Sequence, residues 1–139
     1  MLTLELMKTH VVKTSPNVSL REAIDQMDIY QVDSMPVADE DGKLVGMISE
    51  REILSELMPS NQPVISALFE LDMSCVEKTV AECMTPALSL LENEDAKIAA
   101  LILLNSKLNR IPVVASDRIV VGTLNRIDVF QAIFDGVLK

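Results

Sequence analysis

The sequence predicts an α+β (α/β) fold in which two pseudo-twofold-related strand-helix-strand-strand-helix repeats pack as one module. The first observation is an internal repeat, because placing Pro36 on Pro112 also brings Gly46 onto Gly122. The second is that each copy changes from helical to strand-like apolar spacing in the same order. The third is size, since a unit of roughly 50 residues buries too little apolar surface to be stable alone. Two such units are therefore expected to pack together.

The first repeat is expected to begin with a short strand at residues 10–13 and to continue into a helix. Ser19 and Glu22 form the S-x-x-E pattern that starts a helix. Apolar residues at i, i+3, i+4 and i+7 then give this helix one face to bury. These residues are Leu20, Ala23, Ile24 and Met27.

Two strands and a second helix complete the first repeat. Residues 36–38 and 44–48 are expected to pair as a hairpin, because the polar residues between them include Gly42. A helix at 50–58 follows and ends before Pro59. The second repeat has the same order, with a strand at 87–90, a helix at 96–104, strands at 113–114 and 119–124, and a helix at 127–137. Since residues 98–104 are apolar on almost every side, this helix is expected to be more buried than its counterpart.

These elements divide the chain into a first repeat at residues 1–58, a connecting segment at 59–83 and a second repeat at 84–139. The connecting segment is expected to contain a short amphipathic helix, because it lacks glycine and has apolar residues at helical spacing. Those residues are Val64, Ala67, Leu68 and Leu71.

Composition and charge exclude several classes of protein. The 139 residues are 49% hydrophobic and include only 4 glycines, which is not the composition of a disordered chain. The net charge of −9 argues against nucleic-acid and anionic-membrane partners, although all of it lies in residues 1–83. No apolar run is long enough to span a membrane, and the N-terminus lacks a secretory-signal pattern. We therefore expect a cytoplasmic protein.

Three short motifs each occur twice in the same order, with one extra residue of offset for the methionine-initiated pair. They are Met-Pro-Val at 35–37 and Ile-Pro-Val-Val at 111–114, the segments 46–52 and 122–128 that begin with glycine, and the segments 7–9 and 84–86 that begin with methionine. Together they resemble a tandem pair of cystathionine-β-synthase (CBS) domains, and the resemblance covers nearly the whole chain. It implies a regulatory module with two clefts between its repeats.

The resemblance also implies ligands and partners. The ligand would be an adenine nucleotide (AMP, ADP or ATP) or S-adenosylmethionine, and the bound state would reach a partner protein through a population shift. Such modules commonly form homodimers. The exposed faces of residues 50–58 and 127–137 are expected to pair in the dimer, with Phe130, Ile133 and Phe134 as apolar anchors.

In the family, the last motif of a repeat reads Gly-x-x-Ser/Thr-x-x-Asp, and its carboxylate accepts hydrogen bonds from the ribose hydroxyls. The first repeat has Ser49 but replaces the aspartate with Glu52, whereas the second keeps Asp128 but has Asn125 in place of the hydroxyl residue. These departures leave two functions open. One is a ligand-sensing module, and the other is a structural dimerisation or interaction module with unoccupied clefts.

By the family's arrangement, each cleft would combine residues from both repeats. The first cleft would contain Thr9, His10, Val32, Asp33, Leu124, Asn125, Arg126 and Asp128. The second cleft would contain Thr85, Pro86, Leu108, Asn109, Arg110, Ile48, Ser49 and Glu52. We favour the first cleft because it keeps Asp128, although Asp33 is a poor neighbour for a phosphate and Arg110 lies near the second.

Each motif residue also has a structural interpretation. Ser49 and Asn125 are good helix N-cap residues, while Glu52 and Asp128 are acids that stabilise the first turn of a helix. The arginines of the two clefts are more typical of solvated or acid-paired side chains than of phosphate ligands. The motif glycines favour close packing of strands.

The sequence contains no candidate catalytic or metal site. His10 is the only histidine, and the two cysteines, Cys75 and Cys83, do not form a Cys-x-x-Cys pair. It has no nucleophile elbow, phosphate-binding loop or dinucleotide-binding glycine pattern. We therefore expect no enzymatic activity.

Overall fold

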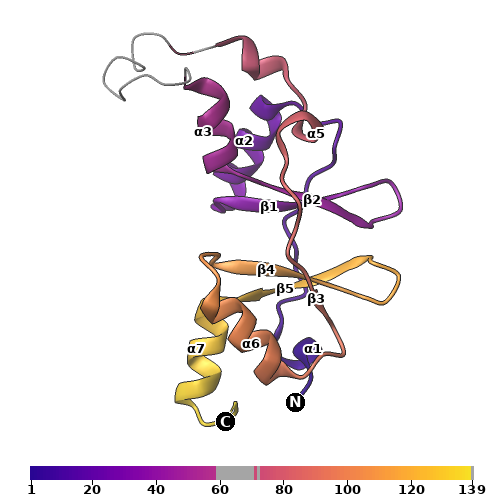
Figure 1. Cartoon of the computed structure of the whole chain (residues 1–139), viewed down its shortest axis with the longest axis vertical. Helices are drawn as coiled ribbons and strands as arrows, with labels where there is room; N and C mark the ends of the chain where they lie inside the picture. Colours follow the sequence, from indigo (N-terminus) through magenta and orange to yellow (C-terminus); the bar gives the residue numbers. More distant parts are fainter. Residues whose placement is uncertain (59–70, 72, 139) are drawn as a thin grey trace. The chain divides into compact units, whose positions relative to one another are not determined.

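The computed structural model describes residues 1–58, 71 and 73–138 and divides the chain into two compact units (Figure 1). Unit 1 contains Met1–Val11, Asp41–Leu44 and Ala87–Lys139. Unit 2 contains Val12–Glu40 and Val45–Pro86. Each unit combines helices with a small sheet, which confirms the α+β class.

Unit 2 is built around the first hairpin. Its elements are α2 (Leu20–Tyr30), β1 (Ser34–Ala38), β2 (Leu44–Ser49, all but its first residue), α3 (Glu50–Leu57), η1 (Met73–Glu77) and α5 (Val80–Cys83). Strands β1 and β2 pair, η1 contacts both α2 and α3, and α5 contacts α3. Leu20, Met35 and Ile48 lie at the centre of the core and are almost completely buried.

Unit 1 has a larger sheet. Its elements are α1 (Thr3–Leu6), β3 (Leu90–Leu91), α6 (Ala96–Asn105), β4 (Arg110–Val114), β5 (Val120–Asn125) and α7 (Arg126–Phe134). The strand order is β3-β4-β5, with β3 parallel to β4 and β4 antiparallel to β5. Figure 1 shows α6 next to α7, and these two helices contact each other. The core contains Leu103, Ile111 and Leu124.

The N-terminal segment packs with the second repeat. Thr3 is fully buried, and both its backbone N–H and its hydroxyl donate to the carbonyl of Glu94, at 2.8 and 2.9 Å. Lys8 and Thr123 exchange two backbone hydrogen bonds of 2.8 and 2.9 Å. Residues 1–11 therefore belong to the same unit as 87–138, although they precede the first repeat's helices in the chain.

The two motif glycines lie where the methionine-initiated segments cross a strand. In unit 1 the carbonyl oxygen of Lys8 would lie 2.6 Å from a Cβ placed on Gly122. In unit 2 the carbonyl oxygen of Thr85 would lie 3.0 Å from a Cβ placed on Gly46. A side chain at Gly122 would collide with backbone, and one at Gly46 would crowd the Met84 sulfur at 2.8 Å, so close packing explains both glycines.

Most predicted helices and strands are present, and the exceptions are instructive. The strand predicted at 10–13 is wrong, because this segment pairs only through Thr14, which bonds to the backbone on both sides of Val37. The strand predicted at 87–90 is reduced to Leu90–Leu91. The last helix ends at Phe134 because Gly136 adopts a left-handed conformation with φ +73°.

Burial of the helix faces agrees with the prediction only in part. Ile24 is exposed, because α2 buries only the narrower stripe of Leu20, Ala23 and Met27. Helix α6 is more buried than α2, as predicted, since it buries Ala96, Ala99, Ala100 and Leu103. Its apolar residues Ile98 and Leu101 are nevertheless exposed, because α1 and α7 contact only part of its circumference. The connecting helix predicted around Val64, Ala67 and Leu68 lies outside the described residues, and Leu71 belongs to no helix.

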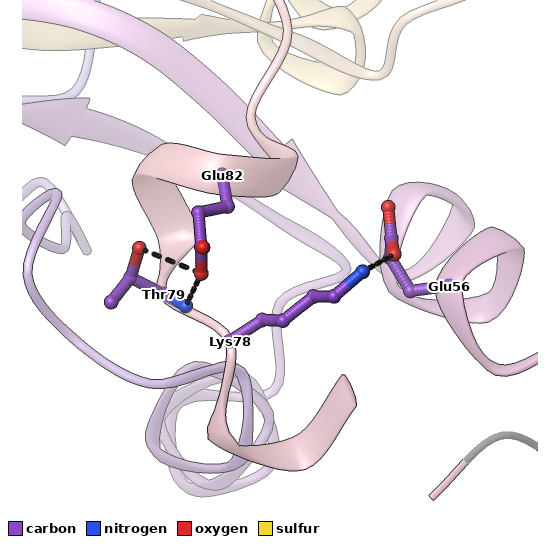
Figure 2. Close-up of polar contacts among 4 residues, drawn as sticks. All are labelled: Glu56, Lys78, Thr79 and Glu82. Atoms are coloured by element: carbon purple, nitrogen blue, oxygen red, sulfur yellow. Dashed lines mark hydrogen bonds and ion pairs between the residues drawn. The ribbon is translucent and has the colours of Figure 1, made fainter. Parts of the chain in front are cut away.

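Unit 2 contains polar contacts around the start of α5 (Figure 2). The backbone N–H of Thr79 donates to Glu82 at 2.7 Å and begins α5 with a capping box. Lys78 donates to Glu56 of α3 at 2.8 Å. Burial, and then the carboxylate of Glu56, raise the pKa of the Cys83 thiol at the end of α5.

None of the helices formed by the described residues has both the length and the apolar character that crossing a membrane requires.

Candidate functional site

The candidate site in unit 1 lies where β5 passes into α7. Arg110 of β4 pairs with Asn125, the last residue of β5. The backbone N–H of Arg126, the first residue of α7, donates to the carbonyl of Asn109 at 2.8 Å. Sheet register and this hydrogen bond therefore bring the start of β4 to the start of α7.

A pocket of about 280 Å³ opens at this junction. Two arginines, two amides and two apolar side chains line it: Asn109, Arg110, Asn125, Arg126, Ile127 and Phe130. Such a lining suits a ligand with one apolar and one polar or anionic part.

Four buried polar atoms at the same junction have no hydrogen-bond partner among the described residues. They are Arg110 Nε, Asn125 Oδ1, Arg126 Nε and Asp128 Oδ2. Two are donors and two are acceptors, and leaving a buried polar atom unpaired costs about 1–3 kcal/mol. Three belong to residues that line the pocket, and the fourth belongs to the first turn of α7. Within the described residues, the buried side-chain polar atoms that lack a partner are thus concentrated at this junction.

The guanidinium of Arg126 also makes hydrogen bonds to the main chain. Its Nη2 donates to the carbonyls of Ser106 and Leu108, at 2.8 and 2.7 Å. The interpretation of Arg126 as a solvated or acid-paired residue is therefore wrong, because its partners are main-chain carbonyls. By holding residues 106–108, Arg126 orders the loop that leads into the pocket.

Lys8 is a site residue that the sequence interpretation missed. Its Nζ lies 3.8 Å from Asp128 Oδ1, an ion-pair distance without a hydrogen bond, while Oδ2 has no partner. Thr9 and His10 follow it in the same unit and are exposed. The repeat contained a signal for Lys8, since its counterpart is Thr85, which was among the predicted residues.

The equivalent junction in unit 2 has the same backbone and a different chemistry. The N–H of Glu50 donates to the carbonyl of Asp33 at 3.0 Å, just as Arg126 donates to Asn109. However, the Glu52 carboxylate accepts from the hydroxyl of Ser49, and its other oxygen accepts from Thr85 Oγ1 at 3.2 Å. Both oxygens of this acid are thus occupied by the protein itself.

The structure settles other interpretations of the motif residues. Ser49 and Asn125 are the N-cap residues of α3 and α7, as predicted, but neither side chain makes a capping hydrogen bond. Glu52 and Asp128 do lie in first turns of their helices. Ile48 and Leu124 are fully buried in the two cores, which leaves only their backbone for a ligand.

The predicted clefts draw on both units. Of the first set, Thr9, His10, Leu124, Asn125, Arg126 and Asp128 belong to unit 1, and Val32 and Asp33 belong to unit 2. Of the second set, Ile48, Ser49, Glu52, Thr85 and Pro86 belong to unit 2, and Leu108, Asn109 and Arg110 belong to unit 1. Asn109 and Arg110 line the same pocket as Asn125 and Arg126, with which they were not grouped.

Comparison with known proteins identifies the family. The family model for the CBS domain matches residues 4–59 and again residues 80–135. The chain belongs to the CBS domain family. As a CBS-domain pair it is 34% identical to the CBS domain-containing protein CBSX1, chloroplastic, of Arabidopsis thaliana. The alignment covers 88% of this chain and 58% of CBSX1, so the chain spans little more than half of that relative's length.

Solved structures of other CBS pairs have the same fold. CBSX2 of Arabidopsis thaliana in complex with AMP is 26% identical, with a TM-score of 0.78 over 98% of both chains. The CBS domain pair of protein MJ0100, in complex with 5′-methylthioadenosine and S-adenosyl-L-methionine, is 25% identical. Its TM-score is 0.73 over 99% of this chain and 98% of that one.

Proposed function

We propose that this CBS pair is a regulatory module that binds an adenosine-containing nucleotide at the β5–α7 junction of unit 1 and signals the bound state to a partner protein. The observation that carries the proposal is the set of four unpartnered polar atoms at this junction. The module acts by shifting a conformational equilibrium and catalyses no reaction.

The chemistry of a nucleotide matches the unused atoms. A ribose diol donates hydrogen bonds, and Asp128 Oδ2 is a buried acceptor without a donor. A phosphate accepts hydrogen bonds, and the Nε atoms of Arg110 and Arg126 are donors without an acceptor. Ile127 and Phe130 supply apolar surface for the base. Because both cationic side chains favour an anion, AMP, ADP or ATP suits the pocket better than the cation S-adenosylmethionine.

The ligands named for the similar structures support the same class. CBSX2 was solved with AMP, and MJ0100 with two ligands that also contain adenosine. Adenosine is the part that all three ligands share.

A structural interaction module with unoccupied clefts is the second candidate, and the unit 2 junction favours it. Glu52 already accepts from Ser49 and Thr85, so a ribose would have to displace both hydroxyls. We therefore place the nucleotide in unit 1 only. The cytoplasmic location and the regulated partner stay predictions.

A thermal-shift assay with AMP, ADP, ATP and S-adenosylmethionine tests the proposal. At least one nucleotide is expected to raise the melting temperature, since a ligand at about 100 times its Kd stabilises the folded state by about 2.7 kcal/mol. Asp128→Ala is expected to abolish the shift, because it removes the unpartnered acceptor.

Glu52→Gln is the matched control, since it alters the equivalent acid of the other repeat. It is expected to keep the nucleotide shift of the wild type. If no nucleotide at millimolar concentration stabilises the protein, the structural interaction module is the correct function. If Glu52→Gln abolishes the shift and Asp128→Ala does not, the nucleotide has been placed in the wrong unit.

A further inference from the structure

A second pocket, of about 300 Å³, lies in unit 2 where β1 ends. None of its lining residues lines the β5–α7 pocket, and all of them belong to unit 2. A pocket in which several polar groups converge is a candidate binding site. Five of the lining residues are polar or charged and two are small and apolar: Lys13, Thr14, Ser15, Gln26 and Asp39, with Val18 and Ala38.

A hydrogen-bonded pair of side chains forms part of the pocket wall. Thr14 is only 6% exposed, and its hydroxyl donates to Gln26 Oε1 at 2.8 Å. This bond uses the acceptor of the Gln26 amide and leaves Nε2 as a donor, while the Thr14 oxygen can still accept. The pair therefore offers a ligand both a donor and an acceptor.

The backbone around the pocket is fixed by hydrogen bonds to two other elements. The N–H of Thr14 donates to the carbonyl of Pro36, and its own carbonyl accepts from the N–H of Ala38, at 3.0 and 2.9 Å. The carbonyl of Val18 accepts from the N–H of Val80, the first residue of α5, at 2.8 Å. The pocket is thus preformed, which lowers the ordering cost of binding a ligand.

The second repeat has apolar residues at the positions of this pair. A shift of 76 residues places Thr14 on Leu90 and Gln26 on Ile102, and the parallel strand pairing of Thr14 matches that of Leu90. Leu90 belongs to the core of unit 1, and Ile102 packs against that core. Replacing both partners of a hydrogen bond by apolar groups of the same shape costs little stability. The fold therefore does not require a polar pair here, and ligand binding explains it better than stability does.

We infer that this pocket binds a small zwitterion of the free α-amino acid class. Lys13 supplies a cation for the ligand's carboxylate, and Asp39 supplies a carboxylate for its ammonium group. A carboxylate accepts several hydrogen bonds at once, so Asp39 can accept from an ammonium group beside the contact that it already makes. The Gln26 amide adds a donor, and Val18 and Ala38 give apolar surface to a small side chain.

The charge of unit 2 favours a ligand that carries an ammonium group. This unit contains 13 acidic and four basic residues. A purely anionic ligand would be repelled by this excess of negative charge. A purely cationic ligand would place a second positive charge beside Lys13. A zwitterion avoids both penalties.

A thermal-shift assay of the whole chain with each standard L-amino acid at about 10 mM tests this inference. At least one amino acid is expected to raise the melting temperature. Acetate and ethylammonium, which each carry only one charge of the zwitterion, are expected to cause no shift. Calorimetric titration then measures the Kd of the amino acid with the largest shift. Asp39→Asn is expected to raise this Kd about 10-fold or more, because it removes a charge-assisted hydrogen bond. Asp25→Asn is the matched control, since Asp25 is an exposed acid of α2 outside the pocket, and it is expected to leave the Kd unchanged.

The double variant Thr14→Val, Gln26→Leu gives this pair the apolar character of the second repeat. It is expected to fold, as checked by circular dichroism, and to lose the amino-acid shift. Its response to AMP is expected to equal that of the wild type, so failure of this inference and failure of the nucleotide proposal are distinguishable. The inference is overturned if no amino acid shifts the melting temperature, or if acetate or ethylammonium alone produces the same shift. It is also overturned if the folded double variant keeps the wild-type affinity, or if Asp25→Asn weakens binding as much as Asp39→Asn.

Discussion

At the scale of single residues, the two repeats differ most at the motif acid. Asp128 has one oxygen 3.8 Å from the Lys8 ammonium and a second, buried oxygen without a partner. Glu52, one methylene longer, accepts hydrogen bonds from two hydroxyls. The same position therefore leaves one acid available to a ligand and the other satisfied by its own unit.

The motif glycines give a prediction at this scale. Gly122→Ala is expected to destabilise the protein by about 1–3 kcal/mol, because the new methyl group would meet the backbone of Lys8. Gly46→Ala is expected to cost less, since the gap to Thr85 is larger. Urea denaturation of both variants measures the difference. A Gly122→Ala variant that is more stable than the wild type would contradict the close packing. Such a result would mean that the lower conformational entropy of the unfolded chain outweighs any clash in the folded state.

At the scale of elements, helices with similar start patterns begin in different ways. The Ser19 hydroxyl accepts from the backbone N–H of Glu22 at 3.1 Å and caps α2 as predicted. The Asn125 side chain does not cap α7, and its Oδ1 is buried without a partner. Residue type alone therefore does not decide which helix start is capped.

Ser19→Ala and Asn125→Ala test this difference. The first is expected to lower the free energy of unfolding by about 1 kcal/mol, the usual cost of a lost N-cap. The second is expected to leave it unchanged or to raise it by up to about 1–3 kcal/mol in the absence of nucleotide, because it removes a buried acceptor that has no partner. Chemical denaturation compares the two variants. Equal losses would show that Asn125 does stabilise α7.

At the scale of the whole molecule, order along the chain does not match membership of the compact units. Residues 1–11 contribute α1 and the Lys8 crossing to unit 1, whose other elements begin at residue 87. α1 contacts α6, α7 and β5. The first residues of the chain therefore stabilise its last elements.

Thr3→Asp tests this arrangement, because Thr3 is fully buried in unit 1. A buried carboxylate is expected to cost at least about 2 kcal/mol. Hydrogen exchange monitored by mass spectrometry is expected to accelerate in β4 and β5, far away in sequence. The amides of α2 and β1 serve as the internal control and are expected to change less. Faster exchange confined to residues 12–40 would contradict the assignment of Thr3 to unit 1.

Local sequence patterns predicted the helices and strands well, but they predicted poorly which residues of each helix are buried. The hairpin around Gly42 and the helix that starts at Ser19 depend on neighbours in sequence, and both were predicted correctly. Ile24 and Leu101 satisfy helical periodicity, yet they are exposed. Periodicity states that a helix has an apolar side, but not how much of that side its neighbours cover.

The sequence by itself determined the two repeats, their hairpins and helices, and membership of the CBS family, because these follow from spacing and residue type along the chain. It also named Asn109, Arg110, Asn125 and Arg126, which line the β5–α7 pocket, but assigned them to two different clefts. The tertiary structure decided that Lys8 forms an ion pair with Asp128, that Ser49 and Thr85 donate hydrogen bonds to Glu52, and that Leu101 is exposed to solvent. The physical reason is that each of these outcomes depends on which distant segment lies against a side chain.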